Sequence, residues 1–264
     1  MVDSHVHSTF SPDGIGSMEE ILQRARALGM QYIAFTEHLD LDYMFYQNQP
    51  QKLNIARYAG RALKLREQYP EFEIAIGVEL GYCAHNIRQT KELLASYPFD
   101  VIINSVHMTD GKDAFGGEMF LGKTKKEIFG AYLDDVLKSV TSDIPYDIVG
   151  HIGYISRYAP YPDKKILYGE FPAKIDDILK AIIERDATLE VNAASMGSGS
   201  LTLPDVNILN RYKSLGGTKI TYGSDAHSAK SLCRNYHEVM NLIKSVGYDY
   251  VVIYSGRQCV KVKI

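Results

Sequence analysis

Hydrophobic and polar residues follow two alternating patterns along this chain. Short runs rich in β-branched and aromatic residues are typical of buried strands, and the longer stretches between them repeat apolar residues at helical spacing. The stretch 17–30 also carries helix boundaries, because Ser17 and Glu20 are spaced as a capping box and Gly29 follows the last apolar residue. The apolar face expected for this helix consists of Ile21, Leu22, Ala25 and Leu28.

The two patterns alternate through the whole chain. Strands are expected at 2–7, 32–38, 73–80, 99–107, 146–152, 188–193 and 219–227, with a last one at 250–256. Helices are expected at 17–30, 55–69, 87–97, 125–140, 173–186, 205–216 and 236–247. Strands joined by crossover helices run parallel, so the pattern favours an α/β fold. We expect a distorted, TIM-barrel-like (β/α)7 barrel forming one domain over 1–264, with a doubly wound open sheet as the alternative.

Ionisable side chains gather where the predicted strands end. The residues at these ends are His5, His7, Glu37, His38, Glu79, His107, His151, Asp225 and His227, with the neutral Asn192 after the sixth strand. In a parallel barrel all of these ends lie on one face, where active sites are built. Six of the chain's eight histidines belong to this set, whereas His85 and His237 are interpreted as surface or capping residues.

This clustering predicts a metal centre. Imidazole and carboxylate groups without thiolates suit Zn, Mn or Fe(II), and burying them without a compensating charge would be costly. Zinc commonly takes about four ligands, fewer than the candidates available, so two to three divalent ions are implied. A carboxylate such as Glu79 is able to bridge two of them.

Composition narrows the remaining function classes. The net charge of -3 gives no electrostatic reason to expect binding to nucleic acid or to a membrane. We find no apolar run of roughly 18 residues for a spanning helix and no signal-peptide pattern. The three cysteines, too few for a disulfide framework, favour a reducing cytoplasm. The oligomeric state stays open.

Several of these stretches resemble the successive motifs of the polymerase and histidinol phosphatase (PHP) superfamily, and within it the metal-dependent histidinol-phosphatases. The stretches are "DSHVHSTFSPDG", "TEH", "GVEL", "NSVHMTDG", "GHIGYISRYAP" and "GSDAH". The resemblance implies a (β/α)7 barrel with a trinuclear metal centre. It also implies hydrolysis of L-histidinol phosphate to L-histidinol and phosphate, a step of histidine biosynthesis, by a phosphoric monoester hydrolase.

The resemblance also implies a distribution of ligands. A first ion would be held by His5, His7, Glu79 and Asp225, and a second by Glu79, His107 and His151. A third would be held by Asp13, His38 and His227. Some members have a histidine in place of Asp13, which makes this third site weaker or different in metal preference. Many members have aspartate at the position of Glu37. This residue is expected to contact a metal ligand and orient it without touching the ion.

A metal-activated hydroxide would then attack phosphorus in line. Arg157, in the loop after the fifth strand, is the expected phosphate clamp, because guanidinium matches phosphate geometry. Ser105 and Asn192 are expected to line the site. The amine and imidazole of the substrate would be received by acidic residues near the mouth: Asp40, Asp42 or Glu118.

Other functions remain open on the sequence alone. Within phosphoester chemistry they are a nucleotide phosphatase, a 3′–5′ exonuclease and a phosphotyrosine-protein phosphatase. An amidohydrolase also opens with two histidines one residue apart, but no lysine ends a predicted strand. A non-enzymatic metal-binding regulator would be expected to have lost ligands, and none is lost here.

Overall fold

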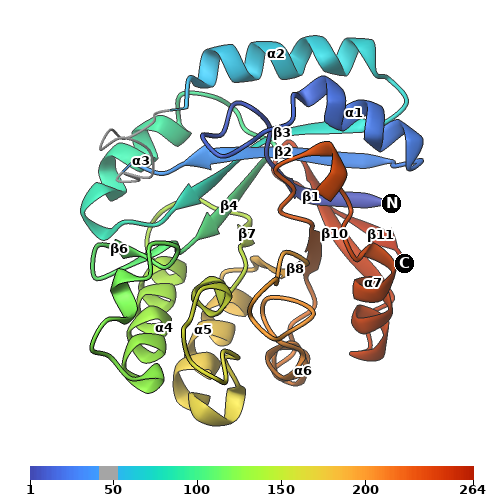
Figure 1. The fold of residues 1–264 in the computed structure, drawn as a ribbon. Coiled ribbons are helices and arrows are strands. Elements are labelled where there is room, and N and C mark those ends of the chain that lie inside the picture. Colours follow the sequence, from blue (N-terminus) through green and yellow to red (C-terminus); the bar gives the residue numbers. More distant parts are fainter. Residues whose placement is uncertain (42–52) are drawn as a thin grey trace.

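Seven parallel strands form the central sheet of the computed structural model, which describes residues 1–41 and 53–264 (Figure 1). In spatial order they are β1 (Val2–Val6), β2 (Tyr32–Leu39), β3 (Glu73–Gly81), β4 (Val101–Ser105), β7 (Ile148–Val149), β8 (Thr188–Asn192) and β9 (Ile220–Gly223). Because the spatial order follows the chain order, every connection is a crossover to the neighbouring strand, as in a barrel.

The first and last of these strands close the sheet on itself. The backbone N–H of Asp225 donates to the carbonyl of His5 at 2.9 Å, and that of His7 donates to the carbonyl of Ala226 at 2.8 Å. Val6 and Ala226 also form a parallel bridge. The predicted (β/α)7 barrel is therefore confirmed, and the open doubly wound sheet is wrong.

In the described residues, seven α-helices cover the outside of the barrel. They are α1 (Met18–Ala27), α2 (Ile55–Gln68), α3 (Ile87–Leu94), α4 (Lys125–Thr141), α5 (Pro172–Glu184), α6 (Val206–Ser214) and α7 (Tyr236–Ser245). The predicted capping box of α1 is present, with Ser17 accepting from the backbone of Glu20, and Gly29 adopts the left-handed conformation that ends such helices. Figure 1 shows α2 above β2 and β3, with α4, α5 and α6 on the opposite side.

Amphipathic faces explain why the helices pack where they do. In α5, for example, the side chains that face the sheet are all buried: Ile175, Ile178, Leu179 and Ile182. Their spacing matches one face of a helix, as the sequence pattern indicates. Short 3-10 helices in the connecting loops complete the fold at Ala84–Asn86, Glu118–Phe120, Tyr154–Arg157, Tyr168–Glu170 and Ala229–Ser231.

Two barrel strands are much shorter than the sequence pattern predicts. The expected strand 146–152 is reduced to β7, and the expected strand 219–227 ends with β9 at Gly223. Asp225 has a left-handed backbone with φ of 52°, which no continuous strand accommodates. The ligand candidates after these strands therefore lie on loops that begin at the barrel rim.

The last expected strand lies outside the barrel sheet. β10 (Tyr250–Ser255) forms an antiparallel hairpin with β11 (Gln258–Lys263). The sequence pattern did not predict β11. A second small hairpin joins β5 (Met108–Thr109) to β6 (Lys112–Asp113). Within the described ranges, no helix is long and apolar enough to cross a membrane.

The C-terminal hairpin packs against the start of the barrel strands. Tyr32 Oη, at the start of β2, donates to the carbonyl of Tyr254 at 2.8 Å. The Tyr254 hydroxyl lies 2.7 Å from Thr188 Oγ1, at the start of β8, and 3.3 Å from the carbonyl of Asp147. The hairpin therefore covers the end of the barrel opposite the candidate ligands, where interactions serve stability.

Replacing Tyr254 with phenylalanine is expected to lower the free energy of unfolding by about 1 kcal/mol, because it leaves buried hydrogen-bonding groups without their partner. Urea denaturation measures this change. Tyr250→Phe is the matched control, since the Tyr250 hydroxyl donates to the carbonyl of Thr218 at 3.1 Å on an exposed surface. Equal effects of the two changes would show that the hairpin contact contributes nothing special.

Candidate active site

The strand ends bring most of the candidate ligands together in a buried cluster. Exposed side-chain fractions are 0 % for His5, His7 and Glu79, and 5 % or less for Asp225, His107 and His151. Groups that are this polar lie inside proteins only when they are paired with one another or with an ion. The geometry of the cluster decides which applies.

Four candidate ligand atoms lie close together at the end of β1. His5 Nε2 lies 3.0 Å from His7 Nε2, 3.3 Å from Glu79 Oε2 and 3.8 Å from Asp225 Oδ1. His7 Nε2 lies 3.4 Å from the same glutamate oxygen and 3.6 Å from the same aspartate oxygen. Ligands about 2.0–2.2 Å from a tetrahedral ion are roughly 3.3–3.6 Å apart. His5 Nε2, His7 Nε2 and Asp225 Oδ1 lie within 4.8 Å of one another, near the spacing of such a site, and Glu79 Oε2 lies beside both imidazoles.

A second group forms around the other oxygen of Glu79. Glu79 Oε1 lies 2.7 Å from His151 Nε2 and 3.2 Å from His107 Nε2. Both oxygens of this carboxylate thus face imidazole nitrogens, one toward each group. The bridging position that the sequence suggested for Glu79 is geometrically open.

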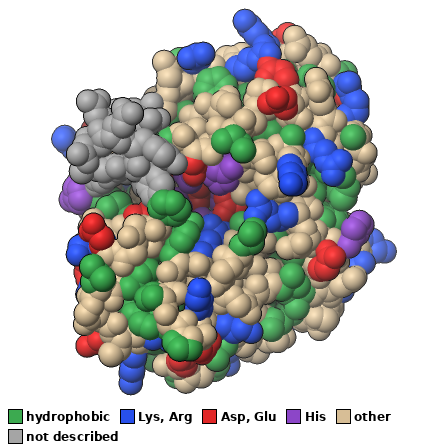
Figure 2. Space-filling view, in the orientation of Figure 1, with side chains coloured by type: hydrophobic (Ala, Val, Ile, Leu, Met, Phe, Trp, Pro, Cys, Tyr) green, Lys and Arg blue, Asp and Glu red, His purple; other side chains and the backbone are tan. Residues whose placement is uncertain are grey.

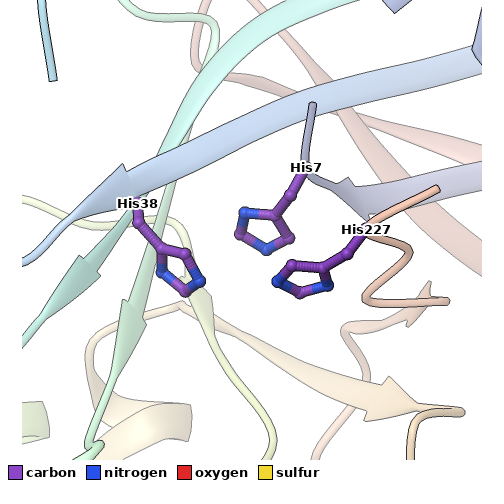
Figure 3. Close-up of side chains that lie close together, drawn as sticks. All are labelled: His7, His38 and His227. Atoms are coloured by element: carbon purple, nitrogen blue, oxygen red, sulfur yellow. The ribbon is translucent and has the colours of Figure 1, made fainter. Parts of the chain in front are cut away.

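The third group lies nearer the surface. Asp13 Oδ2 is 3.1 Å from His227 Nε2 and 3.6 Å from His38 Nε2. Figure 3 shows that His7 lies with its ring beside those of His38 and His227, and both centroid distances are 4.3 Å. His38 Nδ1 also lies 3.1 Å from Glu79 Oε2, so the third group is continuous with the first.

The charges in this cluster oppose one another. Burial alone would lower the pKa of His5, but the charges of Glu190 and Glu79 help to raise it well above its usual value. For His7, burial and the nearby positive charge of His227 hold the pKa well below its usual value. The imidazoles therefore cannot all be positively charged. Bound cations would interact favourably with both the neutral ring nitrogens and the carboxylates.

Each of four imidazoles has a partner on its second ring nitrogen. His5 Nδ1 lies 2.6 Å from Glu190 Oε1, and His107 Nδ1 lies 2.9 Å from Asp40 Oδ1. His227 Nδ1 lies 3.0 Å from the backbone carbonyl of Asp225. Such contacts fix the tautomer and orientation of histidines that ligate metals.

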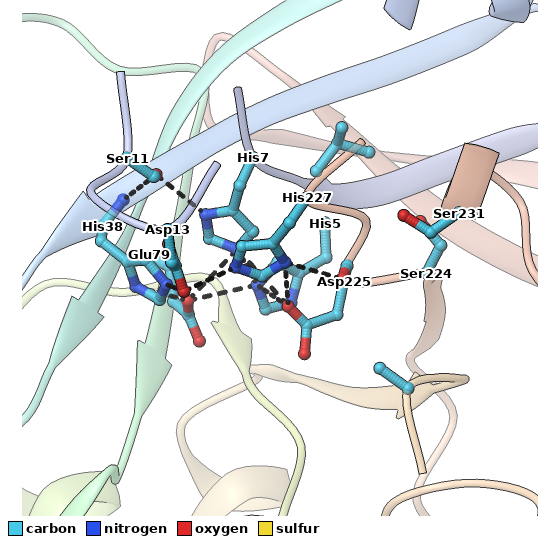
Figure 4. Close-up of polar contacts among 12 residues, drawn as sticks. His5, His7, Ser11, Asp13, His38, Glu79, Ser224, Asp225, His227 and Ser231 are labelled. Carbon is cyan, nitrogen blue, oxygen red and sulfur yellow. Dashed lines mark hydrogen bonds and ion pairs between the residues drawn. The ribbon is translucent and has the colours of Figure 1, made fainter. Parts of the chain in front are cut away.

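The partner of the fourth imidazole involves Glu37. His7 Nδ1 lies 3.1 Å from Ser11 Oγ, and that hydroxyl donates to Glu37 Oε2 at 2.6 Å (Figure 4 shows the contact between Ser11 and His7). The Ser11 hydroxyl also accepts from the backbone of His38 at 3.0 Å. Glu37 thus reaches His7 through a serine, an arrangement compatible with the orienting role expected for it.

Arg157 lies in a pocket that opens beside the cluster. Its Nη2 donates to Asp225 Oδ2 at 2.8 Å and to Asn192 Oδ1 at 3.1 Å. Its Nε is buried and makes no hydrogen bond within the part of the chain that the structure describes. Figure 2 shows a hollow where histidine, acidic and basic side chains meet. The pocket is lined by Asp13, His38, Glu79, His107, Phe115, His151, Tyr154, Arg157, Tyr158, Asp225 and His227.

Other expected site residues are placed elsewhere. Asn192 lies behind Arg157, and Ser105 is buried next to Gly150, where a Cβ would overlap with its hydroxyl. Neither side chain lines the pocket described above. Asp40 is buried against His107 instead of lying at the mouth, because it satisfies an imidazole nitrogen.

Glu118, His85 and His237 do not line the pocket either. Glu118 is exposed on a 3-10 helix, and Asp42 lies outside the described residues. His237 is on α7, and His85 lies beside Cys83, with Nδ1 3.1 Å from the sulfur. Both histidines are thus away from the cluster, in line with the surface role expected for them.

Sequence reasoning missed several residues that shape the site. Glu190 is one, although an acidic residue inside the apolar run "TLEVN" was a usable signal, two positions before Asn192 on the same strand face. Phe115, Tyr154 and Tyr158 form an aromatic wall, with ring centroids 5.4 Å apart for the two tyrosines and 5.5 Å for Phe115 and Tyr158. They lie on loops, where sequence pattern gives no position.

Two known proteins are similar to this chain over most of its length. A histidinol-phosphatase of Lactococcus lactis is 31% identical over 264 residues, covering 99% of this chain and 97% of the relative. A probable histidinol-phosphatase of Clostridium acetobutylicum is 30% identical over 243 residues, 92% of each chain.

A crystal structure from Lactococcus lactis has the same fold. It is that of a histidinol phosphate phosphatase complexed with zinc, L-histidinol and phosphate, with a TM-score of 0.90, 31% identity and 98% of both chains covered. The family model that matches residues 3–194 is that of the PHP domain. The chain belongs to the PHP domain family.

Proposed function

We propose that this protein is a metal-dependent phosphatase that hydrolyses L-histidinol phosphate to L-histidinol and phosphate, a step of histidine biosynthesis. The observation that carries the proposal is the buried cluster of histidines and carboxylates around Glu79, beside a buried arginine in an open pocket. The Lactococcus lactis relative, which spans nearly the whole chain, supports the substrate because its crystal structure holds L-histidinol and phosphate.

The residues fit two to three divalent ions, with zinc favoured over manganese or iron. Nitrogen and oxygen donors alone make up the groups, and the relative contains zinc. His5, His7, Glu79 and Asp225 would hold the first ion, with His107 and His151 joining Glu79 around the second. Asp13, His38 and His227 would hold the third, the most exposed of the three.

The chain's own residues then bind and orient the substrate. When bound, the ions supply an activated nucleophile at neutral pH and stabilise the attacking and leaving oxygens. Arg157 lines the pocket and binds the phosphate there through its guanidinium, while its Nη2 stays tied to Asp225 and Asn192. This tie holds the guanidinium in place before substrate arrives, so little side-chain entropy is lost on binding.

The aromatic wall lies beside Arg157, whose Cζ is 5.3 Å from the centre of the Tyr154 ring, and it suits the rest of the substrate. Phe115 lines the pocket, and 57 % of this residue is exposed. Tyr154 lies behind it and contacts His107 and His151 with ring centroids 5.1 and 5.4 Å away. We place the imidazole ring of histidinol phosphate against this wall, because aromatic rings favour such contacts.

The amidohydrolase alternative receives no support from the pocket. Within the described residues, its lining contains imidazoles, carboxylates and one arginine, and no lysine stands at the position of Glu79. We place the reaction in the cytoplasm, where Cys83, Cys233 and Cys259 stay as free thiols.

Substrate choice is tested by phosphate release from a panel of monoesters. We expect histidinol phosphate to be hydrolysed with the highest kcat/KM, well above nucleoside monophosphates and phosphotyrosine, because the similar Lactococcus lactis structure holds L-histidinol and phosphate. A higher kcat/KM for phosphotyrosine or a nucleotide would reassign the substrate while leaving the phosphatase chemistry intact.

Metal content is tested on protein purified without chelators. Elemental analysis is expected to find more than one ion per chain, and dialysis against a chelator is expected to abolish phosphate release until Zn²⁺, Mn²⁺ or Fe²⁺ is returned. Asp13→Ala is expected to remove about one ion per chain, since it deletes the oxygen ligand of the outer site. A metal-free protein with full activity would refute the metal centre.

Arg157→Ala is expected to reduce kcat/KM for histidinol phosphate by about 100-fold, because it removes a preorganised donor to developing negative charge. Arg157→Lys is expected to recover only part of the loss, since lysine lacks the planar fork. Arg211→Ala is the control, because Arg211 pairs with Asp176 away from the pocket. Unchanged kinetics in Arg157→Ala would rule out the phosphate clamp.

A further inference from the structure

Glu190 connects two ligand groups from behind. It lies on β8 with 1 % of its side chain exposed, and its two oxygens have different partners. Oε1 is 2.6 Å from His5 Nδ1, whereas Oε2 accepts a hydrogen bond from the backbone N–H of His151 at 2.6 Å. One carboxylate thus contacts the ring of one candidate ligand and the backbone of another, in two different groups.

The contact with His5 determines which ring nitrogen faces the centre. When Nδ1 donates its proton to a carboxylate, the lone pair of Nε2 is free to bind a cation. His5 Nε2 is the atom that approaches His7, Glu79 and Asp225. Glu190 therefore holds the tautomer that the first group needs.

Gly223 provides the space for this contact. It lies on β9 opposite Asn192 in the sheet register. A Cβ at this position would overlap with Glu190 Oε1 and would stand 2.8 Å from the Cβ of His5. Gly223 is not among the residues with positive φ, so its backbone would accept alanine. Lack of space, and not conformation, is what requires glycine here.

The charge of Glu190 has few other partners. Within residues 1–41 and 53–264, the ion pair with His5 is the one that Glu190 makes, and no lysine or arginine pairs with it. Burying a carboxylate that pairs with a single imidazole costs free energy, so fold stability alone does not account for Glu190. The arrangement is explained if His5 in turn binds a cation.

We propose that Glu190, seated by Gly223, is a positioning residue that fixes His5 for metal binding and sets the backbone position of His151. The inference rests on the metal centre of the proposed function. It adds a residue that does not line the pocket and acts only through two ligands.

The test uses two variants that disturb the contact in different ways. Glu190→Gln keeps the shape but removes the charge and one acceptor, and Gly223→Ala leaves the glutamate in place but fills its space. Two controls carry matched changes far from the ligands. Asp147→Asn alters a buried carboxylate that accepts from the backbone of Ile102, and Gly217→Ala crowds the ring of Tyr212.

Zn²⁺ affinity is measured by competition with a chelator, and Co²⁺ is substituted to record the visible absorption of the site. We expect both Glu190→Gln and Gly223→Ala to bind Zn²⁺ about 10- to 100-fold more weakly, with an altered Co²⁺ spectrum, while remaining cooperatively folded. Both controls are expected to keep the affinity and the spectrum of the unaltered protein, even where their unfolding temperature falls.

Unchanged Zn²⁺ affinity and Co²⁺ spectrum in Glu190→Gln and Gly223→Ala would overturn the inference. So would unfolding of both variants while the controls fold, because Glu190 would then serve the fold and not the ligands. If Glu190→Gln alone fails to fold, Gly223→Ala decides between these outcomes. Failure of the unaltered protein to bind Zn²⁺ would instead count against the metal centre itself.

Discussion

One buried carboxylate organises the interior of this barrel. Both oxygens of Glu79, on β3, face imidazole nitrogens at 2.7–3.4 Å, and the exposed fraction of its side chain is 0 %. Those nitrogens belong to His5, His7, His38, His107 and His151. An unpaired charge at this depth would cost a large free energy. Burial of Glu79 therefore depends on the strands that bring these histidines to it.

The two ends of the barrel therefore solve different problems. At the carboxyl ends, polar groups are packed against one another and held from behind by Glu190, Asp40 and Ser11. At the amino ends, the C-terminal hairpin covers the strands with hydroxyl and carbonyl contacts such as that of Tyr254 with Thr188. The polar cluster at the carboxyl ends is thus separated from the interactions that stabilise the barrel at the amino ends.

Much of the fold and the set of candidate ligands could be predicted from sequence. Alternating strands and helices indicate parallel strands and favour a barrel over an open sheet, and the period of two along a strand puts His5 and His7 on one side. The family resemblance then divided the ligands into three groups. The structure brings these residues into one cluster, and their division among ions stays a prediction. Whether these groups hold metal remains a prediction.

Contacts across the barrel could not be read from the chain. Glu190 meets His5 because β8 and β1 flank β9, and this depends on closure between strands remote in sequence. Asp40 was expected at the mouth, but burial turns it toward His107, a contact that no local pattern encodes. β10 has the composition of a barrel strand, and only its pairing with β11 shows that it is not one.

Barrel closure also has a consequence for the order in which the protein is made. The strand that begins the barrel is tied to the far end of the chain, as in the bond from the Ser224 N–H to Asp3 Oδ1 at 2.9 Å, across 221 positions. Contacts this distant form late, because loop closure must be achieved first. On a ribosome, His5 and His7 emerge about 220 residues before Asp225, so the first ligand group stays incomplete over that interval of synthesis.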